Sequence, residues 1–156
     1  MLAIDRVGMA GGDLQDRQII HRLRQSPGRA VNYQYLVVSE SVEDMPRLDV
    51  LVVKDMGRIK EKLKKKIKPG VGLEMAVVPA RKMDAGRWFS GVRELYSYCQ
   101  SSGCQFVLSS GADSPHSMVS GQCLDAILQT AGIEPCEHWC EMNEWLKTRL
   151  ARRVRV

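Results

Sequence analysis

A run of lysines is the strongest chemical signal in this sequence. Residues 58–68 place Ile59, Leu63 and Ile67 four positions apart, with six lysines around them and a single acid, Glu61. On a helix the three apolar residues form one narrow stripe, so the lysines occupy the remaining surface. A cationic face with so little compensating charge favours contact with a polyanion, because lysines neutralise phosphates and release their counterions. A solvated amphipathic helix is the alternative interpretation.

A second basic cluster lies near the C-terminal end of the sequence, where Arg149, Arg152, Arg153 and Arg155 fall within seven residues. Cations favour the C-terminal end of a helix, and this effect accounts for one or two of these arginines. Contact with phosphates or with a partner protein is the second interpretation of the cluster.

Three potential metal ligands occur close together in the segment Cys136-x-His138-x-Cys140. On a helix Cys136 and Cys140 share a face, whereas His138 points away from it. The sequence also contains no C-x-x-C pair of the kind common in zinc sites. We therefore expect no metal site, and we expect the five cysteines, an odd and scattered number, to be reduced thiols.

Signatures of catalysis are missing from the sequence. The three histidines are isolated from one another, and neither Ser109 nor Ser110 has the G-x-S-x-G context of a nucleophile elbow. The sequence also contains no glycine-rich loop of the G-x-x-x-x-G-K-[ST] or G-x-G-x-x-G type that would cradle a nucleotide. Catalysis by this chain alone is therefore not expected.

Alternating strands and helices must position these residues. The apolar and helical periodicities predict strands at 1–4, 33–39, 49–54, 72–79 and 104–109, and helices at 14–25, 58–68, 85–101, 120–131 and 137–154. Repeated βα units of this kind indicate an α/β fold with a parallel sheet. An open doubly wound sheet and part of a (β/α)8 barrel both fit, although 156 residues are too few for a complete barrel. Both architectures place functional groups beyond the carboxyl ends of the strands.

Composition sets the broad class of the protein. The chain carries 23 Lys plus Arg against 18 Asp plus Glu, a net charge of +5, and 44% of its residues are hydrophobic. These values are typical of a folded globular domain and exclude a disordered chain. No apolar run approaches the roughly 18 residues of a membrane helix, and no secretory signal is visible, so we expect a single cytoplasmic domain without membrane contact.

Two segments in a fixed order carry a family resemblance. Residues 71–79 read VGLEMAVVP, and after a long predicted helix residues 104–112 read CQFVLSSGA, followed by Pro115 and later by Gly132 and Ile133 before a final helix. In this order, over about residues 48–150, the chain resembles the ribonuclease P protein component 3 family, the thirty-kilodalton-type subunit of archaeal and eukaryotic ribonuclease P.

The resemblance implies a shortened (β/α) barrel of the TIM type, related to the polymerase-and-histidinol-phosphatase group, that lacks the first βα units of the full family fold. It also implies a non-catalytic protein subunit that binds ribonuclease P RNA and precursor tRNA and assists removal of the 5′ leader. The magnesium ions would be held by the RNA, and no cofactor by this chain. The implied protein partner is a smaller ribonuclease P subunit of ferredoxin-like fold.

We expect RNA phosphates to be contacted by cations on the lysine run and beyond the strand ends, with two serine hydroxyls as further donors. These candidates are Lys54, Arg58, Lys60, Lys64, Lys65, Arg81, Lys82, Arg87, Ser109 and Ser110. Two other functions stay open from the sequence alone. One is a small metal-dependent phosphoesterase of the related barrel group, and the other is a non-enzymatic α/β interaction protein.

Overall fold

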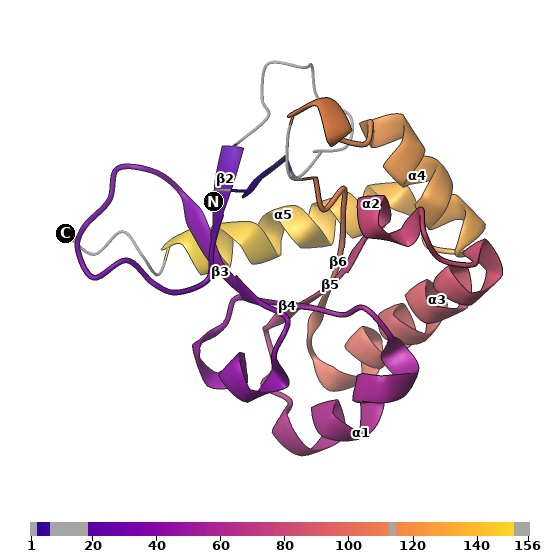
Figure 1. Cartoon of the computed structure of the whole chain (residues 1–156), viewed down its shortest axis with the longest axis horizontal. Helices are drawn as coiled ribbons and strands as arrows, with labels where there is room; N and C mark the ends of the chain where they lie inside the picture. The colour runs from indigo at the N-terminus through magenta and orange to yellow at the C-terminus, as the bar shows by residue number, and fades with distance from the viewer. Residues whose placement is uncertain (1–2, 7–18, 113–114, 152–156) are drawn as a thin grey trace.

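The computed structural model describes residues 3–6, 19–112 and 115–151 and confirms the predicted α/β class (Figure 1). Its six described strands form one sheet in chain order, in which β1 is antiparallel to β2 and the strands from β2 to β6 are all parallel. The strands are β1 (Ala3–Arg6), β2 (Ile19–Leu23), β3 (Tyr35–Ser39), β4 (Val50–Val52), β5 (Gly72–Ala76) and β6 (Gln105–Ser109).

Helices fill the connections after β4 and continue beyond the sheet. They are α1 (Met56–Lys66), α2 (Val77–Ala80), α3 (Ala85–Ser102), α4 (Gly121–Thr130) and α5 (Pro135–Ala151), with 3-10 turns η2 (Val42–Arg47) and η3 (Pro115–Ser117). The side chains of Asp55, Asp84 and Ser120 cap α1, α3 and α4 by accepting a backbone N–H of the first turn. Gly103 ends α3 in the left-handed conformation that favours glycine, with φ of +72°.

The strand order is compatible with a partial β/α fold. In a doubly wound sheet the spatial order of the strands reverses part-way across the sheet, so the strands do not follow their order in the chain. The described strands do keep chain order, as they do in (β/α) barrels. No pairing among the described residues joins β6 back to β1, so the sheet that the structure describes is open at both ends.

Most predicted elements are confirmed within a few residues, but the helix predicted at 14–25 is wrong. Residues 19–23 form strand β2, and residues 14–18 lie outside the described part of the chain. A short run such as Ile19-Ile20 fits either element, and pairing with both β1 and β3 decides for a strand. The strand predicted at 72–79 ends at Ala76 and gives way to the short helix α2, while the weak strand predicted at 1–4 lies at Ala3–Arg6.

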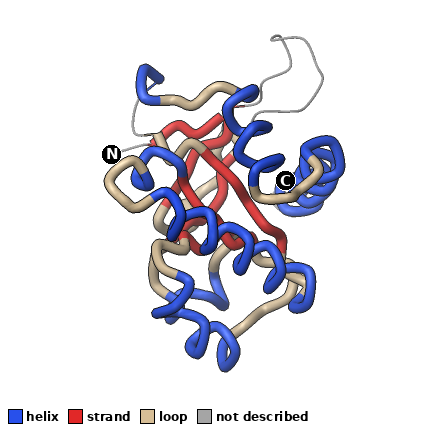
Figure 2. The backbone as a smooth tube through the Cα atoms, turned by 90° about the vertical axis from the view of Figure 1, so that its right-hand side faces the viewer, coloured by secondary structure: helices blue, strands red, loops and turns tan. Residues whose placement is uncertain are grey.

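Helices cover both faces of the sheet, which forms the central layer in Figure 2. On β5, Met75 lies against Gly91 of α3, whereas the neighbouring Glu74 lines a small cavity together with Met142 and Leu146 of α5. When parallel strands follow chain order, right-handed crossovers place the helices that connect them on one face of the sheet. The C-terminal helix α5 therefore covers the opposite face, and Figure 1 shows it crossing the strands.

The second half of α5 is fastened to the edge of the sheet where β4 and β5 begin. Trp145 Nε1 donates to the carbonyl oxygen of Gly70 at 2.8 Å, and the Arg149 guanidinium donates to the same oxygen. Arg149 also lies 3.8 Å from the buried Asp49 carboxylate and 5.9 Å from the centre of the Trp145 ring. The Trp145 ring lies directly over Gly72, where there is no room for a larger residue.

We expect Gly72→Ala to lower the free energy of unfolding by about 1–3 kcal/mol, because overpacking forces side chains or backbone to move. The added methyl group would lie 2.9 Å from Cζ2 of Trp145 and 3.0 Å from Cγ2 of Val107. Urea denaturation measures the change. Gly28→Ala is the control, since no heavy atom beyond its neighbours lies within 4 Å of a methyl group there. Equal losses in the two variants would contradict this account of the α5 contact.

Candidate functional site

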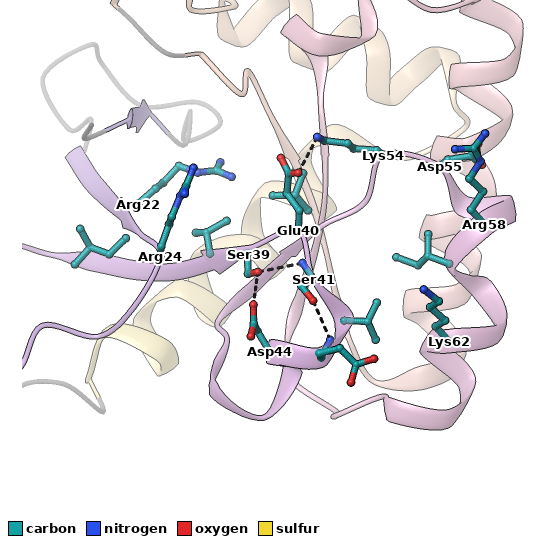
Figure 3. Close-up of a pocket in the computed structure, with 16 residues that line it drawn as sticks. Arg22, Arg24, Ser39, Glu40, Ser41, Asp44, Lys54, Asp55, Arg58 and Lys62 are labelled. Atoms are coloured by element: carbon teal, nitrogen blue, oxygen red, sulfur yellow. Dashed lines mark hydrogen bonds and ion pairs between the residues drawn. The ribbon is translucent and has the colours of Figure 1, made fainter.

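The carboxyl ends of β2, β3 and β4 border a cleft of about 1040 Å³. Parallel strands end at the same edge of a sheet, so the residues that follow them become neighbours in space. Figure 3 shows Arg22 and Arg24 at the end of β2 on one side of the cleft and Arg58 and Lys62 of α1 on the other. Residues 39–41, at the end of β3, lie between these two cationic sides.

Several of the cations around the cleft are paired with acids. Lys54 Nζ lies 2.7 Å from Glu40 Oε2 across the ends of β3 and β4. The Asp55 carboxylate, which caps α1, is 2.8 Å from the Arg87 guanidinium and 3.7 Å from Arg58 Nε. All three cations are exposed, so the pairs lie in water and hold the side chains only weakly. The three cations can therefore leave their carboxylate partners and bind a phosphate instead.

Two cations and one acid of the cleft have no ionic partner among the described residues. Arg24 is exposed on the β2 side, Lys62 is exposed on the α1 side, and no described acid lies within ion-pair distance of either. The acid is Asp44, whose Oδ2 accepts the Ser39 hydroxyl proton at 2.7 Å. The same Ser39 oxygen accepts the backbone N–H of Ser41 at 3.0 Å, which orders the turn between the two cationic sides.

The lysine run forms helix α1, with Leu63 fully buried and Ile59 and Ile67 half-buried, as the spacing predicts. The structure adds acids that the sequence pattern did not reveal. Lys60 Nζ lies 2.7 Å from Glu94 of α3, and this hydrogen bond and charge raise the pKa of Lys60. Lys66 pairs with Glu43 of η2 and Lys64 with Glu61 of α1. The lysine face is therefore partly neutralised by the fold.

The other predicted contacts divide into exposed and buried groups. Arg81 and Lys82 are exposed in the turn after α2, beyond the end of β5, and Lys65 is exposed on α1. Ser109 and Ser110 are only 3% and 1% exposed, so the two serines that we predicted as hydroxyl donors to RNA lie beneath the surface that the structure presents. The Ser109 hydroxyl donates instead to the Glu74 carboxylate.

Sequence reasoning missed the buried charge pair on the α5 side of the sheet. The Arg22 guanidinium donates to both oxygens of the Glu74 carboxylate, which is fully buried and also accepts from Ser109. Burying a carboxylate is costly unless a cation and hydrogen bonds compensate it. An acidic residue, Glu74, within a predicted apolar strand was the sequence signal of a buried charge. Its partner Arg22 was not predicted, because it lies in the segment for which we predicted a helix.

The predicted Cys-His-Cys segment begins α5, and its residues divide between the two faces of that helix as the spacing predicts. Cys136 and Cys140 are exposed, whereas His138 is 2% exposed and packs against the rings of Phe106 and Trp139. Neither ring nitrogen of His138 has a hydrogen-bond partner within the described structure. Burial therefore lowers the pKa of His138 to about 4, although the charge of Asp125 acts in the opposite direction.

No protein-family model, curated protein or solved structure matches the chain. Within residues 3–6, 19–112 and 115–151, no three His, Cys, Asp or Glu side chains are grouped so that they could hold a metal ion. None of the described helices combines the length and apolar character needed to cross a membrane.

We expect Arg22→Leu to lower the free energy of unfolding by roughly 3–5 kcal/mol, because it leaves the Glu74 carboxylate buried and unpaired. The double variant Arg22→Leu/Glu74→Leu should recover most of this loss, and urea denaturation of the wild type, the two single variants and the double variant gives the coupling. Arg24→Leu, two residues along and exposed, is the matched control and should change stability by no more than about 0.5 kcal/mol. Additive losses in the double variant would show that the pair is not coupled.

We expect His138 to make the protein less stable as the pH falls from 6.5 to about 4. The ordinary pKa of 6.5 applies to the unfolded chain, which takes up a proton in this range while the buried imidazole does not. The resulting loss is roughly 3 kcal/mol. Urea denaturation at several pH values should show this share of the pH dependence missing in His138→Phe and retained in Met142→Leu, a buried substitution on the same helix. Parallel profiles for wild type and His138→Phe would contradict it.

Proposed function

We propose that this chain is an RNA-binding protein subunit of ribonuclease P, which assists removal of the 5′ leader from precursor tRNA in the cytoplasm without breaking the phosphodiester bond itself. The resemblance carried by residues 71–79 and 104–112 supports this function. We further propose that the sheet is a shortened (β/α) barrel of that family. The parallel strands in chain order support this finer description, because barrel strands follow chain order.

The observation that carries the proposal is the number of exposed cations on α1 and beyond the carboxyl edge of the sheet. Arg58, Lys62, Lys64 and Lys65 are exposed along α1, and the turn at residues 81–82 adds two more cations beyond β5. Exposed side chains of this kind contact phosphates without reading base sequence. A-form RNA is recognised in this way, since its deep major groove hides the base edges.

Cations of this surface would act by reducing repulsion between two RNA chains. Folded ribonuclease P RNA and precursor tRNA each carry a dense negative charge, and lysines that replace their counterions lower the cost of bringing them together. Magnesium held by the RNA would supply the hydrolytic chemistry. A smaller subunit of ferredoxin-like fold is the protein partner that we propose on the same resemblance.

Reconstitution tests the proposal directly. Ribonuclease P RNA should cleave precursor tRNA at a lower magnesium concentration when this chain and the smaller subunit are added than when the RNA acts alone. The smaller subunit added without this chain is the control. Leader cleavage unchanged by the chain would overturn the proposal, and so would hydrolysis of phosphate esters by the purified chain without RNA.

We expect Lys64→Glu/Lys65→Glu to weaken binding to ribonuclease P RNA and to make its salt dependence shallower. Loss of one or two phosphate contacts reduces the slope of log K against log salt by about 1–2. Filter binding at several salt concentrations measures the slope. Lys147→Glu on α5 is the matched control, because Lys147 is exposed and paired with Glu144 much as Lys64 is paired with Glu61. Equal slopes in all three proteins would remove α1 from the interface.

A further inference from the structure

We propose that the cleft at the ends of β2, β3 and β4 binds an unpaired RNA strand, with phosphates on its two cationic sides and a ribose 2′-hydroxyl on the carboxylate between them. This inference deepens the proposed function and rests on it, because it assigns one form of RNA to one site. Lys64 and Lys65, exposed lysines of α1 that do not line the cleft, would then contact structured RNA outside it.

The shape of the cleft favours a single strand over a double helix. Its volume of about 1040 Å³ lies at the upper end of the range for ligand pockets, roughly 300–1000 Å³. A duplex presents its phosphates on a convex surface and cannot enter a hollow of this kind. An unpaired strand can bend into it and turn its bases outward.

Cations line both sides of the cleft, where each can hold a phosphate of a bound strand. Arg24 and Lys62 lie on opposite sides of the cleft (Figure 3), and neither has an ionic partner among the described residues. Arg58 is 87% exposed beside Lys62, so the α1 side offers a second donor. Cations on opposite sides of a hollow repel each other unless an anion lies between them, and a nucleic-acid strand supplies one phosphate at each nucleotide.

Four carboxylates line the cleft, and Asp44 is the one without an ionic partner among the described residues. This carboxylate gives the cleft a preference among polyanions. Asp44 accepts the Ser39 hydroxyl proton through one oxygen, and an ionised carboxylate has further lone pairs for a second donor. A carboxylate repels phosphate and therefore does not belong in a site built for phosphate alone. A ribose 2′-hydroxyl between two phosphates supplies the missing donor, and it distinguishes RNA from DNA.

Fluorescence anisotropy with three labelled probes tests the inference on the full chain. The probes are a uridine RNA decamer, the deoxyuridine decamer and an RNA duplex of about 16 base pairs, a length that double-stranded RNA-binding domains span. The wild-type chain should bind the RNA decamer at least about tenfold more tightly than Arg24→Glu/Lys62→Glu. The salt slope for the decamer should also fall by about 1.4, at about 0.7 for each phosphate contact on a single strand.

Two further variants separate the parts of the site. Asp44→Ala should bring the affinities for the RNA and DNA decamers together, and their ratio is unaffected by the general gain in positive charge. Lys64→Glu/Lys65→Glu should weaken duplex binding and leave decamer binding within about twofold, as expected when the removed contacts lie outside the site. Circular dichroism and urea denaturation establish that each variant is folded.

The outcomes distinguish a failure of the cleft inference from a failure of the proposed function. Equal decamer affinity for wild type and Arg24→Glu/Lys62→Glu, or an unchanged RNA-to-DNA ratio in Asp44→Ala, would overturn the inference even if ribonuclease P RNA is bound. Decamer binding that depends on these residues, with no effect of the chain on leader cleavage, would support the cleft as an RNA site and overturn the proposed function.

Discussion

Parallel pairing in chain order is the constraint on which the rest of this structure depends. Because β2 to β6 run in the same direction, the ends of β2, β3 and β4 and the starts of α1 and α3 meet at one edge of the sheet. Residues far apart in sequence are brought together in this way: Arg24, Glu40 and Lys54 line the cleft, and Lys54 and Arg87 line a second cavity beside it. The cleft and the exposed cations beside it follow from that arrangement.

Charge at this edge is balanced rather than uniformly positive. Glu40, Asp55, Glu61 and Glu94 each pair with a cation in or near the candidate site. Exposed pairs of this kind contribute little to stability, because water and salt screen them. They do limit how many cations are immediately available to a polyanion, which favours selective contacts at a few positions over a strong and indiscriminate attraction.

Two buried titratable groups, Glu74 and His138, are stabilised in different ways. The Glu74 carboxylate is compensated by Arg22 of β2, two strands beyond its neighbour β4, and by Ser109 of the neighbouring strand β6, so it ties β2, β5 and β6 together on the face that α5 covers. His138 has no such partner in the described structure and is kept neutral among aromatic rings. The first group is stabilised by a cation and a hydroxyl donor, and the second by exclusion of water, which keeps its imidazole neutral.

The sequence by itself determined the α/β class, most of the strands and helices, and the narrow apolar stripe that leaves the α1 lysines outside, since these depend on local periodicity and capping. Tertiary structure alone decided that residues 19–23 form a strand, because pairing on both sides outweighs an ambiguous apolar run. It also decided which acids meet the lysines and that Ser109 turns inward to Glu74. Partners such as Glu94 and Arg22 lie tens of residues away in the chain, and no local pattern encodes which strand edges and helix faces will meet.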